Sequence, residues 1–479
     1  MERDSDRIGG HLCQYGLLRM SITVYIANWI LPVSSAPIEN GAIAVSGEQI
    51  LAVGTDTQVA AYLAATHQDY NIVKLVDAAI LPGLVNVHSH LELTVMRGYL
   101  QGLAFPDWLL KLINGKRRLT TEQLNASAIW GACEAARAGI TTLADTGSRG
   151  AALYGLMAVG LRGIVYQEVF GPDPKQVDSS LDELKLNVAA LTARCGRLVQ
   201  IGVSPHAPYT VSAPLFRQVA RYAISERLPI AVHAAESEYE EQLVRTATGR
   251  FAEQLRQRGI ELEPAHCSVI EYLDRVGVLD AAPLLIHAIR VCEQDLQLIT
   301  SSGSSVAHCP KSNAQLGNGR APLGAMLSAG VRIGLGTDGV VSNNVYDLLD
   351  EARFCSLLHY TVEANAESFA GLVERFGPRA MIKLMTLNGA IALGMEDRIG
   401  TLAAGKQADF IVVGLRSAHL VPVHDIEATI LYSAAAADIR LTVVAGREVF
   451  RDGLILAVDE EEIRQVIDTA AQVLRGEHQ

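Results

Sequence analysis

The chain has 479 residues, of which 49% are apolar and 19% are charged, and its formal net charge is -12. This composition is typical of a globular protein with enough apolar material for a core, and it excludes a largely disordered chain. The negative charge argues against a nucleic-acid partner, because phosphate binding needs a basic face, so we expect a small-molecule substrate.

Residues 1–20 are predicted to form a disordered N-terminal extension, and Met20 offers an alternative translation start. The acidic start lacks the basic-then-apolar order of a signal peptide. No apolar run approaches the roughly 20 residues that span a membrane. The 7 cysteines include no Cys-x-x-Cys pair, which is typical of reduced thiols. We therefore expect a cytoplasmic protein without a membrane partner.

Residues 21–82 form the first predicted structural unit. Short strand-like runs separated by turns occur there at 22–27, 41–46, 49–53 and 72–75. Runs of this length and composition predict the first part of a small β-sandwich.

Residues 83–395 alternate apolar, strand-like runs with longer helical patterns, which is typical of βα units around a parallel sheet. Eight such strands are predicted, at 84–90, 140–146, 163–170, 198–205, 229–235, 284–289, 304–309 and 331–338. Helical spacing is clear at 121–138, 213–226 and 322–329. Eight units predict an α/β fold with a (β/α)8 barrel, whose chemistry belongs at the C-terminal strand ends.

Residues 396–456 return to short strand-like runs, at 408–413, 426–431, 439–444 and 447–450. Two β-rich flanks around one centre predict that this segment completes the sandwich as a discontinuous domain. Residues 457–479 are predicted to form a C-terminal helix.

Polar residues that are hard to explain as structure fall at the predicted strand ends. His88 and His90 stand one residue apart in a strand, so their side chains share a face and can hold one cation. A lone His-x-His pair is weak, but the other strand ends add His206, His233, His287, His308 and Asp338. We assign His88, His90, His233 and Asp338 to one divalent metal ion, zinc before iron or manganese. The fourth strand end offers no bridging carboxylate or lysine for a second metal.

Three further residues are candidates for catalysis or substrate binding. Glu236 lies three residues beyond His233 and is predicted to shuttle protons, although a solvated carboxylate at a helix start is the simpler alternative. His287 is predicted to be catalytic because of its place on the rim; the alternative is a hydrogen-bonded core histidine. His206 is predicted to contact substrate, or equally to make a structural hydrogen bond.

With these residues in place, the chain from about 22 to 455 resembles the amidohydrolase superfamily, most of all its mononuclear aminohydrolase branch. The segments 79–90, 229–236, 284–289, 331–344 and 399–413 carry this resemblance. Segments 204–209, 308–319 and 336–344 resemble motifs of deaminases that act on adenine nucleosides. The resemblance implies hydrolytic deamination, in which Glu236 protonates a ring nitrogen while His287 and Asp338 handle the proton of the attacking water.

The segment after the metal pair bears on the substrate. His90-Leu-Glu, the Trp108 loop and the run from Glu236 are similar to aminodeoxyfutalosine deaminases of menaquinone synthesis, which implies 6-amino-6-deoxyfutalosine as substrate. That compound carries a benzoate, and the basic residues 116–118 suit a carboxylate, unless they form a solvated helix end. The predicted substrate contacts are His206, Trp108, Glu92, Arg117, Ser342 and Asn343, with Trp108 alternatively a core residue.

The same residues also allow other substrates and another function. Within the branch, the substrate could instead be methylthioadenosine, adenosylhomocysteine, adenosine, guanine or an s-triazine. A noncatalytic scaffold, as among relatives of dihydropyrimidinases, is disfavoured because the predicted ligands and Glu236 are retained. By the same resemblance we expect a homodimer or larger homo-oligomer.

Overall fold

The computed structural model describes residues 22–66, 69–363 and 368–476, so the predicted N-terminal extension lies outside the described residues. Within them, eight parallel strands form the centre of the molecule, one for each strand predicted there. These are β5 (Leu84–Ser89), β6 (Ile140–Gly147), β7 (Arg162–Val169), β8 (Val199–Pro205), β9 (Ala231–Ala234), β10 (Leu284–His287), β11 (Ser305–His308) and β12 (Arg332–Leu335).

The eight strands close into a barrel. They pair in chain order as two four-stranded parallel sheets, β5 to β8 and β9 to β12. Across one seam the Val203 N–H donates to the Pro229 carbonyl at 2.9 Å, and across the other the Asp338 N–H donates to the His88 carbonyl at 3.0 Å. The predicted (β/α)8 barrel is therefore confirmed.

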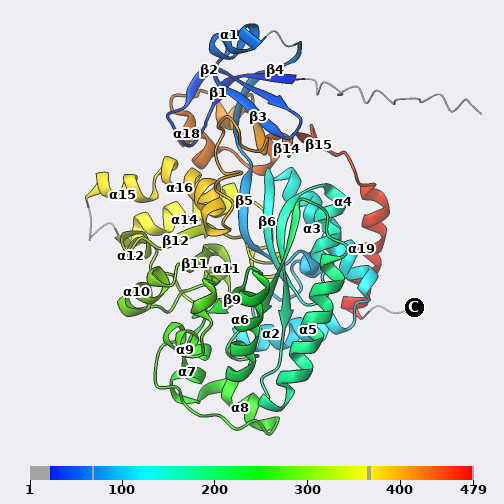
Figure 1. The fold of residues 1–479 in the computed structure, drawn as a ribbon, viewed down its shortest axis with the longest axis vertical. Helices are drawn as coiled ribbons and strands as arrows, with labels where there is room; N and C mark the ends of the chain where they lie inside the picture. Colours follow the sequence, from blue (N-terminus) through cyan, green and yellow to red (C-terminus); the bar gives the residue numbers. More distant parts are fainter. Residues whose placement is uncertain (1–21, 67–68, 364–367, 477–479) are drawn as a thin grey trace, which may run out of the picture.

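Helices surround the barrel (Figure 1). The helices predicted at 121–138, 213–226 and 322–329 are present as α3 (Thr121–Arg137), α6 (Ala213–Glu226) and α12 (Leu323–Ser328). A capping box begins α3, because Thr120 Oγ1 accepts the Gln123 N–H at 3.2 Å and Gln123 Oε1 accepts the Thr120 N–H at 3.0 Å. The other helices of this region are α2 (Phe105–Arg117), α4 (Ala151–Val159), α5 (Val177–Thr192), α7 (Glu238–Thr246), α8 (Gly249–Gln257), α9 (Val269–Arg275), α10 (Glu293–Ser301), α11 (Pro310–Gln315), α13 (Val340–Asn343), α14 (Leu348–Glu363), α15 (Phe369–Phe376), α16 (Pro378–Met385) and α17 (Leu387–Ala392).

The two flanks of the chain meet in one eight-stranded sheet, with strand order β16-β15-β14-β13-β4-β1-β2-β3. Its strands are β1 (Ile22–Ile30), β2 (Ile38–Ser46), β3 (Gln49–Thr55), β4 (Tyr70–Pro82), β13 (Phe410–Gly414), β14 (Ile439–Val444), β15 (Arg447–Arg451) and β16 (Leu454–Ile455). The long strand β4 joins the flanks, since it pairs with β1 on one side and with β13 on the other. The small domain therefore needs both ends of the chain.

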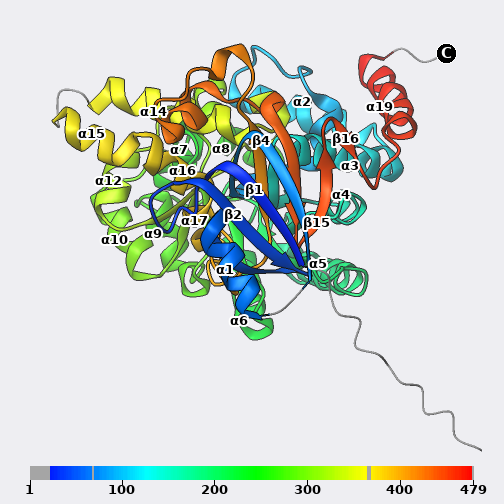
Figure 2. The same cartoon turned by 90° about the horizontal axis from the view of Figure 1, so that it is seen from above.

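This flank sheet lies across the N-terminal end of the barrel (Figure 2). Only Gly83 separates β4 from the first barrel strand, and a Cβ there would lie 2.1 Å from Thr141 Oγ1. Glycine is therefore required at this close approach. The C-terminal strand ends, where barrel enzymes carry their active sites, face away from the sheet and are free to form a pocket.

One predicted strand of the second flank is wrong. Residues 426–431 are helical, with α18 (Ile426–Ala428) followed by a π-helical turn over Thr429–Ser433. The Asp425 carboxylate caps this helix by accepting the Ala428 N–H at 3.0 Å. Ile426 and Ile430, four residues apart, are both buried. A short apolar run does not distinguish strand from buried helix, and here the cap and the four-residue spacing decide.

Two more helices complete the fold. The sequence did not indicate α1 (Asp56–Thr66), which follows β3. The last helix, α19 (Glu460–Arg475), runs beside α3, where Arg137 pairs with Glu460. The Arg118 guanidinium also donates to the Leu474 carbonyl at 3.0 Å. In the described part of the chain, no helix combines the length and the apolar character needed to cross a membrane.

Candidate metal centre and active-site pocket

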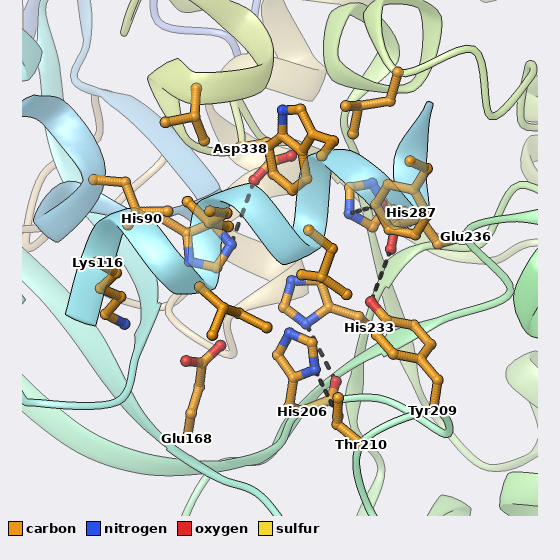
Figure 3. Close-up of a pocket in the computed structure, with 18 of the residues that line it drawn as sticks. His90, Lys116, Glu168, His206, Tyr209, Thr210, His233, Glu236, His287 and Asp338 are labelled. Atoms are coloured by element: carbon orange, nitrogen blue, oxygen red, sulfur yellow. Dashed lines mark hydrogen bonds and ion pairs between the residues drawn. The ribbon is translucent and has the colours of Figure 1, made fainter. Parts of the chain in front are cut away.

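The four predicted metal ligands lie together at the C-terminal end of the barrel. His88 Nε2 and His90 Nε2 lie 3.3 and 3.4 Å from Asp338 Oδ1. The ring of His233 has its centroid 5.0 Å from that of His88 and 5.6 Å from that of His90. Figure 3 shows His90, His233 and Asp338 around the same space. Strands β5, β9 and β12 thus bring together residues that lie up to 250 positions apart in the chain.

Backbone carbonyls orient two of the imidazoles. His90 Nδ1 lies 2.8 Å from the Thr146 carbonyl, and His233 Nδ1 lies 3.2 Å from the His206 carbonyl. Because a carbonyl only accepts hydrogen bonds, each Nδ1 must carry the proton. The lone pair of each Nε2 is then free to ligate, which is the usual arrangement of a metal-binding histidine.

Asp338 is held equally firmly. Its Oδ2 accepts hydrogen bonds from Ser312 Oγ at 2.5 Å and from Ser342 Oγ at 2.8 Å. Burial would raise the pKa of Asp338, but its contacts with His88 and His90 outweigh burial and hold the pKa well below its usual value. Asp338 and His287 have φ angles of 59° and 74°, in the left-handed region that is strained for residues other than glycine. Such strain at a cluster of polar residues is typical of a functional site.

The donor set fits a divalent metal ion. His88 Nε2 is buried and has no hydrogen-bond partner within the described residues. Burial lowers the pKa of His88 to about 4, so the imidazole is neutral and keeps its lone pair. Neutral imidazoles beside one ionised carboxylate are the ligands that zinc and similar ions take in catalytic sites.

Glu236 lies beside this cluster, directly after β9. Its Oε1 is 3.6 Å from His287 Nε2 and accepts a hydrogen bond from Asn318 Nδ2 at 3.3 Å, while Tyr209 Oη donates to Oε2 at 3.5 Å. Burial, with the charge of Asp338 adding to it, raises the pKa of Glu236 well above its usual value. The raised pKa favours the protonated carboxyl, which is the form that can deliver a proton to a bound ligand.

His90, His233, Glu236, His287 and Asp338 line one pocket, whose other side is the apolar face of α2. Its described lining consists of His90, Glu92, Leu93, Phe105, Trp108, Leu109, Leu112, Ile113, Lys116, Glu168, Phe170, His206, Tyr209, Thr210, His233, Glu236, His287, Leu316, Asp338 and Val341. Three of the predicted substrate contacts, Glu92, Trp108 and His206, are among these residues. The sites suggested by sequence therefore converge on a cavity with an apolar wall and a polar floor, as ligand pockets generally do.

The other predicted substrate contacts lie elsewhere. Arg117 is exposed at the end of α2 and does not line the pocket. Ser342 lies behind Asp338, where it orients that carboxylate. Asn343 is also buried, and its Nδ2 donates to the Thr337 carbonyl at 2.7 Å and to Glu351 Oε2 at 2.6 Å. These two residues brace the metal centre from outside the pocket.

His308, which the sequence also placed at a strand end, faces away from the pocket. It forms a separate buried group with Cys355 and His359 of α14. Because side chains alternate along a strand, a strand-end histidine can point either into the barrel mouth or out toward the helices. The sequence pattern alone did not resolve this choice for His308.

Two carboxylates near the centre were missed. Asp145 on β6 accepts hydrogen bonds from Ser89 Oγ at 2.8 Å and from the Leu91 N–H at 2.7 Å, and burial raises its pKa to about 7. Glu168 on β7 lines the pocket and is only 8% exposed. Each is the only acidic residue of its predicted strand, and this was the one feature that could have marked it.

The sequence model of one protein family, the amidohydrolase family, matches residues 79–449, which is most of the chain. The chain belongs to this family. This amidohydrolase is accordingly a hydrolase of carbon–nitrogen bonds, in agreement with the resemblance that its sequence motifs indicated.

Curated relatives match nearly the whole amidohydrolase chain. A Moorella thermoacetica protein named 5-methylthioadenosine/S-adenosylhomocysteine deaminase is 31% identical over 440 residues, covering 91% of this chain and 95% of the relative. A Methanosarcina mazei protein named 5'-deoxyadenosine deaminase is 29% identical over 444 residues, covering 91% and 94%. The match therefore includes the flank sheet as well as the barrel.

Solved structures share the fold of this amidohydrolase. An adenosine deaminase from Xanthomonas campestris with bound zinc has a TM-score of 0.81 and 26% identity, covering 95% of this chain and 98% of that one. The aminofutalosine deaminase of Helicobacter pylori has a TM-score of 0.73 and 18% identity, covering 90% and 100%. At 18% identity, the second likeness is one of fold alone.

Proposed function

We propose that this protein is a metal-dependent aminohydrolase that deaminates an adenine-type nucleoside and releases ammonia. The observation that carries the proposal is the buried Glu236, which stands 3.6 Å from His287 in the same pocket as the predicted ligands His90, His233 and Asp338. Relatives named for the deamination of methylthioadenosine, adenosylhomocysteine and 5'-deoxyadenosine support it.

The residues of the pocket have separate tasks in this reaction. A divalent ion, when bound, supplies the Lewis acidity that makes water nucleophilic at neutral pH. Glu236 protonates the ring nitrogen beside the carbon under attack, so that electron density from the opening C=N bond has a place to go. Asp338 accepts one proton of the attacking water and passes it to the amine, which leaves as ammonia when the C–N bond breaks. The second proton of the water returns to Glu236 as the C=O bond of the product forms. His287, 3.6 Å from Glu236, orients the attacking oxygen.

Zinc is the metal that we propose, before iron or manganese. The donor set of imidazoles and one carboxylate suits all three ions. The adenosine deaminase from Xanthomonas campestris, which is 26% identical to this chain, was solved with bound zinc, and this supports zinc here.

For the substrate we propose an adenosine with a neutral substituent at C5', of the 5'-methylthioadenosine type. The α2 wall is apolar at Trp108, Leu112 and Ile113, which suits such a substituent. Lys116 is the cation of the described lining, and it already pairs with Glu92. The benzoate of 6-amino-6-deoxyfutalosine would therefore meet a neutralised site, since Arg117 lies outside the pocket. This arrangement supports the neutral nucleoside over the compound suggested by the sequence.

The experiment is an assay of ammonia release with enzyme of measured metal content. The panel contains 5'-methylthioadenosine, 5'-deoxyadenosine, adenosine, adenosylhomocysteine, 6-amino-6-deoxyfutalosine, guanine and an s-triazine. We expect the highest kcat/KM with 5'-methylthioadenosine or 5'-deoxyadenosine, and loss of turnover after chelation that added zinc restores. Turnover of guanine or the triazine without any adenine nucleoside would refute the proposal, and a preference for the futalosine compound would correct the substrate.

A further inference from the structure

Glu168 is a buried carboxylate for which the fold itself has no evident use. It ends β7, is 8% exposed and lines the active-site pocket. Within the described residues, its carboxylate makes no hydrogen bond and no ion pair, although a ligand atom of each of His206 and His233 lies within 4.8 Å of one of its oxygens. Leaving a polar group buried without a hydrogen-bond partner costs stability, so a ligand is the natural partner.

A second acid and a lysine lie near Glu168. Lys116 Nζ pairs with Glu92 Oε1 and also contacts Ser148 Oγ at 2.8 Å. The other oxygen of Glu92, Oε2, is buried and has no hydrogen-bond partner in the described part of the chain. The charges of Lys116 and Glu92 both act on Glu168. Lys116 thus holds Glu92 directly, and both Glu92 and Glu168 keep carboxylate oxygens without a partner among the described residues.

This polar end lies across the pocket from Glu236. Glu92 follows the first barrel strand and Glu168 ends the third, whereas Glu236 follows the fifth. Figure 3 shows Lys116, Glu168 and His90 on one side, Glu236 and Tyr209 on the other, and His233 between them. A purine that presents its amino-bearing carbon to the centre and its adjacent ring nitrogen to Glu236 would direct N9, on the far side of the fused ring, toward Glu168.

We propose that Glu168, with Glu92 beside it, binds the vicinal 2'- and 3'-hydroxyls of the nucleoside ribose. The inference rests on the function proposed above. Carboxylates accept hydrogen bonds from both hydroxyls of a ribose, and such charge-assisted bonds are strong. Lys116 is a positioning residue, because its ammonium holds Glu92 and offsets the repulsion between the two acids.

The test compares adenosine with 2',3'-dideoxyadenosine in wild-type enzyme and in Glu168→Gln and Glu168→Ala. Hydrogen bonds to a charged group lead us to expect that wild type prefers adenosine by about 100-fold or more in kcat/KM. Glu168→Ala should lower kcat/KM for adenosine by about 30-fold and that for the dideoxy compound by less than about threefold, with Glu168→Gln intermediate. We expect most of the loss in KM. Glu183→Gln, on the exposed face of α5, is the matched control.

Thermal stability separates a binding role from a structural one. If Glu168 serves a ligand, its replacement by glutamine should leave the melting temperature unchanged or raise it, because no described residue of the free protein depends on its carboxyl group. Equal losses of kcat/KM for both nucleosides, or a lower melting temperature with unchanged ribose preference, would overturn the inference while the proposed function stands. A zinc-loaded wild type that deaminates no adenine nucleoside would overturn both.

Discussion

In the candidate metal centre, hydrogen bonds to one polar atom of a side chain orient the other polar atom toward the predicted ion site. The Nδ1 atoms of His90 and His233 are committed to backbone carbonyls, which leaves each Nε2 to ligate. Oδ2 of Asp338 likewise accepts hydrogen bonds from two serine hydroxyls, and Oδ1, which accepts the Gly339 N–H at 2.6 Å, lies toward His88 and His90. The predicted ligating atoms are therefore oriented by the protein itself, and such preorganisation raises the affinity of a site for its ion.

Glu236→Gln tests the proton shuttle at this scale. The amide keeps the shape of the side chain but has no acidic proton, so kcat should fall by about 10²–10⁴-fold. Because Glu236 is not among the predicted ligands, metal content measured by elemental analysis should stay the same. Glu238→Gln, at an exposed position two residues away, is the control. If Glu236→Gln retained turnover, Glu236 would not be the proton shuttle.

Ser342→Ala tests whether this serine braces the metal centre or contacts substrate. Loss of its 2.8 Å hydrogen bond frees Asp338, so metal affinity should fall by about 10–100-fold, as for other residues behind a ligand. Titration of the apo-enzyme with zinc measures this, and saturating zinc should restore a normal KM. An unchanged zinc affinity together with a raised KM would instead make Ser342 a substrate contact. Exposed Ser301→Ala is the control.

At the scale of elements, α14 connects two short helices at the barrel mouth. Its Glu351 accepts the Lys311 N–H at 2.8 Å through Oε1 and Asn343 Nδ2 at 2.6 Å through Oε2. Lys311 belongs to α11 after β11, and Asn343 to α13 after β12. One buried carboxylate thus fixes both segments that flank Asp338, although it lines no part of the pocket.

Glu351 makes a pH-dependent contribution to stability. Burial raises its pKa from 4.5 to about 8, so the folded protein retains a proton that the unfolded chain has already lost. Its contribution is therefore complete below pH 4.5 and is lost as the pH rises to about 8. Relative to Glu351→Gln, which cannot ionise, the wild type should lose thermal stability between pH 5 and pH 8.

Melting temperatures of both proteins across this range measure the effect. Glu374→Gln, an exposed change on α15, should run parallel to wild type. A constant difference between wild type and Glu351→Gln would show that Glu351 does not titrate in this range.

At the scale of the whole molecule, a buried ion pair joins the barrel to the flank sheet. Arg162, at the start of β7, donates from Nε to Asp409 Oδ2 at 2.7 Å and from Nη2 to Oδ1 at 3.0 Å. Asp409 precedes β13 and also accepts the Ala445 N–H at 2.7 Å. The side chains are 4% and 1% exposed. The pair therefore couples the chain's second flank to the centre of the barrel.

Breaking this pair should destabilise the protein strongly. Arg162→Ala leaves Asp409 buried without its cation, which costs about 3–5 kcal/mol in the free energy of unfolding. Chemical denaturation measures the change. The control is Arg250→Ala, which breaks the exposed pair with Asp107 and should change the transition far less. If the two substitutions lowered the free energy of unfolding equally, the buried pair would contribute no more to stability than the exposed one.

The local sequence determined much of the fold and of the chemistry. The apolar runs ending in His88, His233 and Asp338 were long and regular enough to mark barrel strands, and polar residues at their ends marked the mouth. The short run at 426–431 was misassigned, because periodicity over six residues does not separate strand from helix. The acids Asp145 and Glu168 were overlooked because a single carboxylate in a strand carries no spacing signal.

What the sequence by itself determined was the set of residue types available to hold a cation and move protons, since these follow from side-chain chemistry. Only the tertiary structure decided which of them face one another. Strand alternation and barrel closure turned Glu168 into the pocket and His308 toward α14, and the packing of α2 and α13 at the barrel mouth placed Lys116 in the pocket and Ser342 behind Asp338. The direction of a side chain at a strand end depends on how the strands close around the barrel, and no local pattern encodes that closure.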